Sequence, residues 1–264
     1  MIENMKKQYW ALLNKRKRVP VLKNPGYCPT CEREVTFVAR NPWLRDHYCC
    51  SNCGSIPRER ALMRTIETYF PNWQELTIHE SSPGDRGASK RLSRECGKYI
   101  PTQFFPDKKP GNIVGKYRCE NLEALTFEDE SIDLHVTQDV LEHVFQPSKV
   151  FSEISRTLRP GGAHIFTVPI VNKTKPSSVR AQVRGDGQIF HLEPPVYHGN
   201  PINDRGSLVT MDWGFDICRH IYESSGLFTN IIYIDDISNG IRAEYIEVLM
   251  TLKPSESETA NAIP

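Results

Sequence analysis

The sequence predicts an α/β protein with a doubly wound, mostly parallel sheet and a small cysteine-rich module on its N-terminal side. From Leu76 onward, short apolar runs alternate with stretches of helical periodicity, which is the pattern of successive βαβ units. Ahead of this region, five of the eight cysteines lie between Cys28 and Cys53, in a segment too short to bury a core of its own. A chain of 264 residues can form one α/β core and still carry such an appendage.

The composition is that of an ordinary globular protein, with 39% hydrophobic and 25% charged residues. No stretch approaches the roughly 20 apolar residues of a membrane helix, so no membrane association is expected. The basic segment 1–26 lacks the apolar core of a signal peptide, which favours a cytoplasmic location. Overall, 33 basic residues balance 32 acidic ones, so binding to nucleic acid is disfavoured but not excluded.

Two Cys-x-x-Cys pairs, separated by 18 residues, define the module at residues 27–55. The pairs are Cys28 with Cys31 and Cys50 with Cys53. Each pair places two thiolates on one side of a tight turn, so the two pairs can complete the tetrahedron of a zinc-ribbon-like site. Cys49 is an alternative to Cys50 as a ligand, although the two-residue spacing favours Cys50. Because four thiolates close the coordination shell, we expect structural Zn²⁺; the alternative is a reduced, metal-free cluster.

Residues 56–75 are expected to form a linking helix, with Ser55 as its N-cap and Pro57 in its first turn. The main domain follows at 76–252. Its strands are expected at 76–80, 99–104, just before Asn121, 132–137 and 163–168, and its helices at 88–96, near 140, at 148–158 and at 215–225.

Two further strands, at 228–234 and 245–252, should form an antiparallel pair that closes the sheet. The segment 170–207 is long and rich in proline and glycine, which is typical of lids and binding loops. The tail 253–264 is expected to be disordered.

Four motifs in the middle of the chain occur in a recognisable order and spacing. They are the segments 121–133 (NLEALTFEDESID), 140–144 (VLEHV), 151–162 (FSEISRTLRPGG) and 165–169 (IFTVP). In this order they resemble the class I S-adenosylmethionine-dependent methyltransferases of the small-molecule type (methyltransferase type 11-like), over roughly residues 76–169. The resemblance implies a Rossmann-like methyltransferase sheet and S-adenosylmethionine as cofactor.

The resemblance also implies the cofactor-binding residues, which follow the first, third and fourth strands of the sheet. They are Glu80, the acid after the first strand; Gly84, where backbone approaches the methionine part; Asn121 and Leu122 beside the adenine; and Gln138. Asp139 is implied to face the sulfonium and the acceptor together with Gln138. Asn121 replaces the usual aspartate, but its amide oxygen can still accept a hydrogen bond from the adenine amino group.

The sequence departs from the family pattern in the cofactor loop and after the second strand. Ser82 and Arg86 stand where the family commonly has glycines. The acid that grips the ribose hydroxyls is not evident, because Gln103 lies near that place and Asp107 follows four residues later.

Methyl transfer to a hydroxyl or amine requires a group that removes a proton from the acceptor. His191 and His198, in the expected lid, are the candidate bases, with Glu193 as an orienting group. The alternative is that both histidines only pin a proline-rich loop. His143 is expected to be structural.

The acceptor is favoured to be a small molecule or a saccharide-like compound. Two alternative functions stay open: a non-catalytic binding protein built on a degenerate methyltransferase fold, and an RNA or protein methyltransferase that captures its substrate through the zinc module. The sequence indicates no particular oligomeric state.

Overall fold

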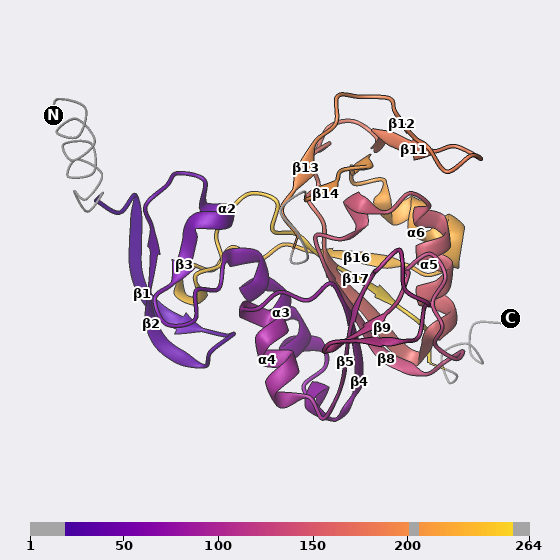
Figure 1. Cartoon of the computed structure of the whole chain (residues 1–264). Helices are drawn as coiled ribbons and strands as arrows, with labels where there is room; N and C mark the ends of the chain where they lie inside the picture. The colour runs from indigo at the N-terminus through magenta and orange to yellow at the C-terminus, as the bar shows by residue number, and fades with distance from the viewer. Residues whose placement is uncertain (1–18, 201–205, 256–264) are drawn as a thin grey trace, which may run out of the picture.

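The structure of this chain is a computed structural model that describes residues 19–200 and 206–255. It is a mixed α/β protein with a large central sheet, beside which the N-terminal module packs (Figure 1). Within the expected basic start and tail, residues 1–18 and 256–264 lie outside the described ranges, whereas residues 22–26 form part of the first strand of the N-terminal module. Within these ranges, none of the helices is long and apolar enough to cross a membrane.

The N-terminal module is a three-stranded antiparallel sheet in the order β1-β2-β3. Its elements are β1 (Leu22–Cys28), β2 (Arg33–Ala39), α2 (Leu44–His47) and β3 (Tyr48–Cys50). Phe37 and Tyr48 are fully buried in its small core, and their rings lie 5.8 Å apart. β1 also contacts the loop around η3 (Ile237–Asn239), where Asn24 donates a hydrogen bond to the carbonyl of Ile237.

Helix α3 (Pro57–Tyr69) joins the module to the main sheet. Pro57 occupies the first turn as expected, but the N-cap is Ile56, so the assignment of Ser55 as N-cap was wrong. The Glu59 carboxylate instead accepts a hydrogen bond from the Ile56 N–H at 3.0 Å. The Ser55 hydroxyl does not cap the helix and instead accepts a hydrogen bond from the Cys53 thiol at 3.2 Å.

The central sheet has eight strands in the order β16-β17-β9-β8-β4-β5-β7-β6. Their bounds are β4 Thr77–Ser81, β5 Lys98–Gln103, β6 Ile113–Val114, β7 Tyr117–Cys119, β8 Ile132–Gln138, β9 Leu158–Thr167, β16 Thr229–Ile232 and β17 Val248–Leu252. Strands β7, β5, β4, β8 and β9 are parallel, while β17 runs antiparallel to both β9 and β16. The expected βαβ succession and the antiparallel closing pair are therefore confirmed.

Helices cover both faces of this sheet. Buried residues of α3 and of α4 (Gly87–Glu95), such as Ile66 and Leu92, pack with Ile78 and Val136 on one face. The other face is covered by α5 (Pro147–Thr157) and α6 (Ile217–Ser225), which pack against the side chains of Phe166 and Leu249. This three-layer arrangement is consistent with a Rossmann-like methyltransferase fold.

The helix expected near residue 140 was wrong. Asp139 has a positive φ of 52°, and after it the chain makes only the 3-10 turn η2 (Leu141–His143). The α-helix starts only at Pro147, because a proline disfavours helical conformation at the residue before it.

The insertion after β9 contains short antiparallel pairs: β10 (Ser178–Val179) with β15 (Met211–Asp212), β11 (Ala181–Val183) with β12 (Ile189–His191), and β13 (Tyr197–His198) with β14 (Ser207–Leu208). The pairs β11 with β12 and β13 with β14 lie above the central sheet in the view of Figure 1.

Candidate functional site

A cavity of about 1360 Å³ lies at the carboxyl ends of the parallel strands. Ser81 and Gln138 line it from the ends of β4 and β8, and His198 lines it from the insertion. In a doubly wound sheet, this edge is where ligands bind. The cavity is therefore the candidate functional site, and it joins the expected cofactor and acceptor regions in one space.

Glu80, at the end of β4, holds together the residues on the cofactor side of this cavity through hydrogen bonds. It is fully buried, and its carboxylate accepts hydrogen bonds from Ser89 (2.6 Å), Tyr99 (2.7 Å) and Gln138 (2.8 Å). Burial raises the pKa of Glu80 above its ordinary value even though these donors favour the ionised form. The carboxylate thus links the helix that follows the cofactor loop with the end of β8.

Gln103 ends β5 and is 6% exposed, and its buried side-chain oxygen has no hydrogen-bond partner within the described part of the chain. It lines the cavity, whereas Asp107 is exposed at the surface. Because a buried acceptor without a donor is costly, this oxygen is suited to a hydroxyl of a bound ligand. From the sequence, Gln103 was identified only as lying near the place where the family has an acid that grips the ribose hydroxyls.

Of the other expected cofactor residues, two line the cavity and one does not. Asn121 and Leu122 line the cavity, although the Asn121 side-chain oxygen already accepts a hydrogen bond from the Glu123 N–H at 3.0 Å. An amide oxygen has a second lone pair for another donor. Gly84 does not line the cavity, and its backbone N–H donates to the hydroxyl of Ser89.

Asp139 lines the cavity between the two regions and is held by two arginines from the N-terminal side of the chain. Its carboxylate lies 2.7 Å from Arg45 Nη2 and 2.9 Å from Arg58 Nε, and it accepts a hydrogen bond from the hydroxyl of Thr167. Burial opposes the ionisation of Asp139, but Arg58 and Arg45 hold its pKa below the ordinary value. At neutral pH it is therefore a carboxylate whose charge is already compensated.

Of the two candidate bases, the structure brings only His198 into the cavity. His191 is exposed on β12 and does not line the cavity. His198 Nδ1 lies 3.7 Å from the carboxylate of Glu142, which raises the pKa of His198 above its ordinary value. The expected orienting group, Glu193, is exposed as well.

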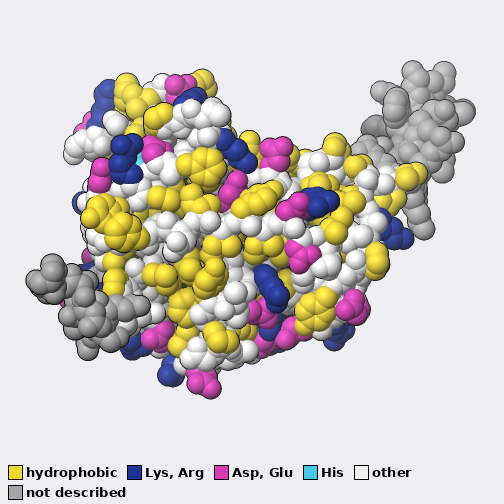
Figure 2. All heavy atoms as spheres, turned by 180° about the vertical axis from the view of Figure 1, so that it is seen from behind, with side chains coloured by type: hydrophobic (Ala, Val, Ile, Leu, Met, Phe, Trp, Pro, Cys, Tyr) yellow, Lys and Arg dark blue, Asp and Glu magenta, His cyan; other side chains and the backbone are white. Residues whose placement is uncertain are grey.

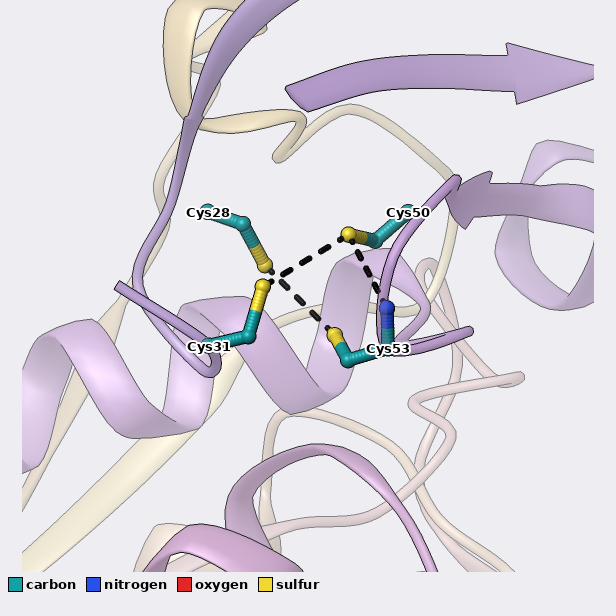
Figure 3. A group of neighbouring side chains, drawn as sticks. All are labelled: Cys28, Cys31, Cys50 and Cys53. Atoms are coloured by element: carbon teal, nitrogen blue, oxygen red, sulfur yellow. Dashed lines mark hydrogen bonds between the residues drawn. The ribbon is translucent and has the colours of Figure 1, made fainter. Parts of the chain in front are cut away.

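The four cysteines of the module converge on one point (Figure 3). The Sγ atoms of Cys28 and Cys53 are 3.8 Å apart, and those of Cys31 and Cys50 are 3.9 Å apart. Four sulfurs at about 2.3 Å from a tetrahedral zinc ion lie about 3.8 Å from one another, so the cluster fits this ion. Cys49 points elsewhere, since its sulfur is 3.9 Å from the backbone carbonyl of Asp46.

Sequence reasoning missed the contribution of the module to the cavity. Trp43, just before α2, lines it together with Arg45 of α2 and Arg58 of α3. Tyr245 lines it from the segment before β17. No local pattern marks these residues as site residues. The pairing of Arg45 with Asp139 joins positions 94 residues apart, and only the packing of the module against the sheet creates it.

Comparison with known proteins links the central part of the chain to one family. Residues 101–166 match the family described as the methyltransferase domain. A 50-residue stretch is 40% identical to a dimethylglycine N-methyltransferase of Parasynechococcus marenigrum (strain WH8102) and covers 19% of this chain and 18% of that protein. The chain thus matches less than a fifth of the length of this curated relative.

Several solved structures are similar to this chain at low identity. An S-adenosylmethionine-dependent methyltransferase from Mesorhizobium loti is 14% identical, with 73% of this chain and 97% of that chain covered and a TM-score of 0.45. A chain from a complex of a Haloferax volcanii methyltransferase activator with a methyltransferase is also 14% identical, with 75% and 91% covered and a TM-score of 0.48. The family match covers residues 101–166, about a quarter of the chain, and makes this segment similar to a methyltransferase domain.

Proposed function

We propose that this protein transfers a methyl group from S-adenosylmethionine to a small-molecule or saccharide-like acceptor. The observation that carries the proposal is the single cavity shared by two sets of side chains. One set, with Gln103, Asn121 and Gln138, follows the strands at which the family holds its cofactor. The other set, with Asp139 and His198, belongs to the region where the acceptor would lie.

The residues present fit the cofactor. The unpartnered oxygen of Gln103 offers an acceptor for a ribose hydroxyl, in place of the missing acid. Asn121 and Leu122 would contact the adenine, while Gly84 lets the loop pass close to the methionine part. Glu80 would act through Ser89 and Gln138 rather than by touching the ligand.

The bound cofactor supplies an electrophilic methyl group on a sulfonium. The chain has to align an acceptor oxygen or nitrogen with that methyl group, exclude water and let a proton leave. His198 is the candidate for the proton because it reaches the cavity from the insertion. His191 stays a candidate only if the insertion moves.

The four-cysteine cluster is proposed to hold structural Zn²⁺. The ion would fix the loop after β1 to the end of β3 and so orient α2, which carries Arg45 to the cavity wall. The module would then shape the acceptor region rather than take part in the chemistry.

An acceptor that is a nucleic acid has less support. On the face shown in Figure 2, lysine and arginine side chains are scattered among hydrophobic and uncharged ones. Affinity for nucleic acid depends on many cationic contacts to phosphates, which a scattered arrangement does not supply.

The first test is calorimetric titration of the full chain with S-adenosylhomocysteine, for the wild type and for Gly84→Val. A Cβ atom at position 84 would meet only Ser89 Oγ, at 3.9 Å, so the variant should fold. Gly84 lies outside the cavity lining, but the resemblance implies that its loop approaches the methionine part of the ligand, so the added side chain should obstruct that approach and weaken the affinity at least about 10-fold. Unchanged affinity in this variant would remove the loop from the proposed site.

Gly185→Val is the matched control, because a Cβ atom there meets nothing within 4 Å and the residue lies in the insertion. This control should bind like the wild type. If the wild type fails to bind S-adenosylhomocysteine, the alternative of a degenerate, non-catalytic protein replaces the proposal.

A further inference from the structure

A second group of potential metal ligands lies in the wall of the cavity, well away from the cysteine cluster. Glu142 and His143 belong to η2, and His198 belongs to β13. One ligand atom from each of the three lies within 4.8 Å of the other two. All three residues line the cavity.

Glu142 is the unusual member of this group. It is 2% exposed, and neither carboxylate oxygen has a hydrogen-bond partner among the described residues. The nearest charged or ionisable groups are the imidazoles, with His198 Nδ1 at 3.7 Å and His143 Nε2 at 3.8 Å from Oε1. A buried carboxylate without donors is costly, and bound cations are among the few groups that offset that cost.

His143 is oriented as a metal-binding histidine usually is. Its Nδ1 lies 2.8 Å from the backbone carbonyl of Leu208, which can only accept, so this nitrogen carries the proton. The lone pair is therefore on Nε2, the atom that faces Glu142. In metal-binding histidines, a hydrogen bond of this kind to a carbonyl fixes both the tautomer and the orientation of the ring.

The backbone that carries Glu142 and His143 is held in place by the insertion. Thr210 donates from its N–H to the Glu142 carbonyl at 2.7 Å, and the Trp213 indole donates to the Leu141 carbonyl at 3.1 Å. β14 also pairs with β13, with Ser207 opposite His198. The short segment from Ser207 to Thr210 therefore contacts both the strand that carries His198 and the turn that carries Glu142 and His143. Such rigidity favours a preformed site.

We propose that Glu142, His143 and His198 bind one divalent transition-metal ion, such as Zn²⁺, in the wall of the acceptor region. Two histidines and one carboxylate form a known ligand set for catalytic zinc and for other metals with open coordination positions. Ligand atoms at about 2.1 Å from such an ion are about 3.0–3.4 Å apart. The two imidazole nitrogens lie 3.7 and 3.8 Å from Glu142 Oε1, and all three ligand atoms lie within 4.8 Å of one another, so the side chains have to move closer together when the ion binds. Positions that these three residues leave open would be accessible from the cavity, which all three residues line.

The role of this ion rests on the proposed function. An acceptor hydroxyl that binds at an open position becomes more acidic, as water does on zinc. Its proton leaves to solvent, the oxygen forms a bond to the methyl group, the bond from that methyl group to sulfur breaks, and neutral S-adenosylhomocysteine departs. His198 then acts as a ligand, and the ion performs the activation otherwise assigned to a base.

The test uses the full chain loaded with one equivalent of zinc, which the four thiolates should bind first, and Co²⁺ is then added. Binding is followed by visible absorption and by calorimetry for the wild type, Glu142→Gln, His198→Ala and the matched control His191→Ala. We expect one Co²⁺ per wild-type chain, without thiolate-to-cobalt absorption, and the same in the control. Loss of one of three ligands should weaken the affinity at least about 100-fold in the other two variants.

Thermal unfolding and zinc content of each variant establish that it is folded, and Glu142→Gln keeps the shape of the side chain. The proposal is overturned if the zinc-loaded wild type takes up no Co²⁺, if uptake shows thiolate absorption, or if both variants bind like the wild type. S-adenosylhomocysteine is titrated on the same samples. Its binding should be unchanged in His198→Ala, so failure of the cofactor site and failure of the metal site are read separately.

Discussion

At the scale of single residues, the site depends on carboxylates that the fold has largely removed from water. Glu80 and Glu142 are buried and Asp139 is partly buried, but the surroundings of the three groups differ. Glu80 accepts hydrogen bonds from three donors and Asp139 pairs with two arginines, whereas the groups that approach the Glu142 carboxylate among residues 19–200 and 206–255 are two imidazoles. Glu80 is therefore suited to holding the loop after β4, and Asp139 to joining the N-terminal module to the central sheet. Glu142 is suited to binding an acceptor or an ion.

Replacing His198 with alanine should lower turnover by about 100-fold to 10,000-fold and leave S-adenosylhomocysteine affinity nearly unchanged, because this side chain serves the acceptor and not the donor. Production of S-adenosylhomocysteine with a panel of hydroxylated small molecules and saccharides is the measurement. His191→Ala should retain most of the turnover, since His191 lies outside the cavity lining. An equal loss in the His191 variant would instead place the proton-removing group on β12.

At the scale of elements, the N-terminal module owes its order to two separate sources. One is the cysteine cluster, and the other is its contact with the rest of the chain. Arg60 of α3 is fully buried and donates to the carbonyls of Tyr48 and Gly240. Gly240 itself has a positive φ of 66°, and a Cβ atom there would lie 2.6 Å from the Phe37 ring, so only glycine suits this close approach.

Chelation of the metal should therefore loosen the module before the α/β domain. Removal of zinc from a small metal-dependent module usually costs most of its folding free energy, whereas the central sheet has its own hydrophobic core. Hydrogen exchange after chelation should show loss of protection in β1–β3, with β4, β8 and β9 still protected. Metal analysis of the His198→Ala variant, which lacks one ligand of the second proposed site, should give about one zinc per chain before chelation, at the cysteines. Simultaneous loss of protection in both regions would contradict this separation.

At the scale of the whole molecule, three histidines are buried in the middle of the central sheet. His79 and His135 hydrogen-bond to each other, and His164 bonds to the hydroxyl of Thr137 on the next strand. Burial lowers the pKa of His79 and of His164 to about 3, and it lowers that of His135 well below the ordinary value. All three are neutral in the folded protein at neutral pH.

The free energy of unfolding should consequently fall steeply as the pH drops from about 6.5 toward about 3. In this window the unfolded chain binds protons at these imidazoles and the folded chain does not, so the acid favours unfolding. His164→Gln removes one such group and should reduce the slope by about 1.4 kcal/mol per pH unit. Urea unfolding at several pH values measures both slopes. The slopes of the wild type and of His164→Gln are compared, because acid also protonates carboxylates and thiolates in both proteins. Equal slopes would show that His164 has an ordinary pKa in the folded wild type.

Much of the fold could be predicted from the sequence because it is encoded in local patterns. Alternating apolar and helical segments predicted the strands β4, β5, β8 and β9, and the Cys-x-x-Cys spacing predicted a four-thiolate cluster. Local patterns failed where conformation depends on a single backbone angle, as at Asp139, whose positive φ precedes a 3-10 turn instead of a helix.

The sequence by itself determined which segments form the sheet, where the thiolates gather and which family the central motifs resemble. The tertiary structure alone decided that Arg45 pairs with Asp139, that Gln103 leaves a buried oxygen without a donor, and that Glu142 and His143 lie beside His198. The physical reason is that periodicity reports which face of an element is buried. Periodicity does not report which polar side chains, distant in the sequence, lie together in a buried site. Their proximity there determines their protonation states and therefore their chemistry.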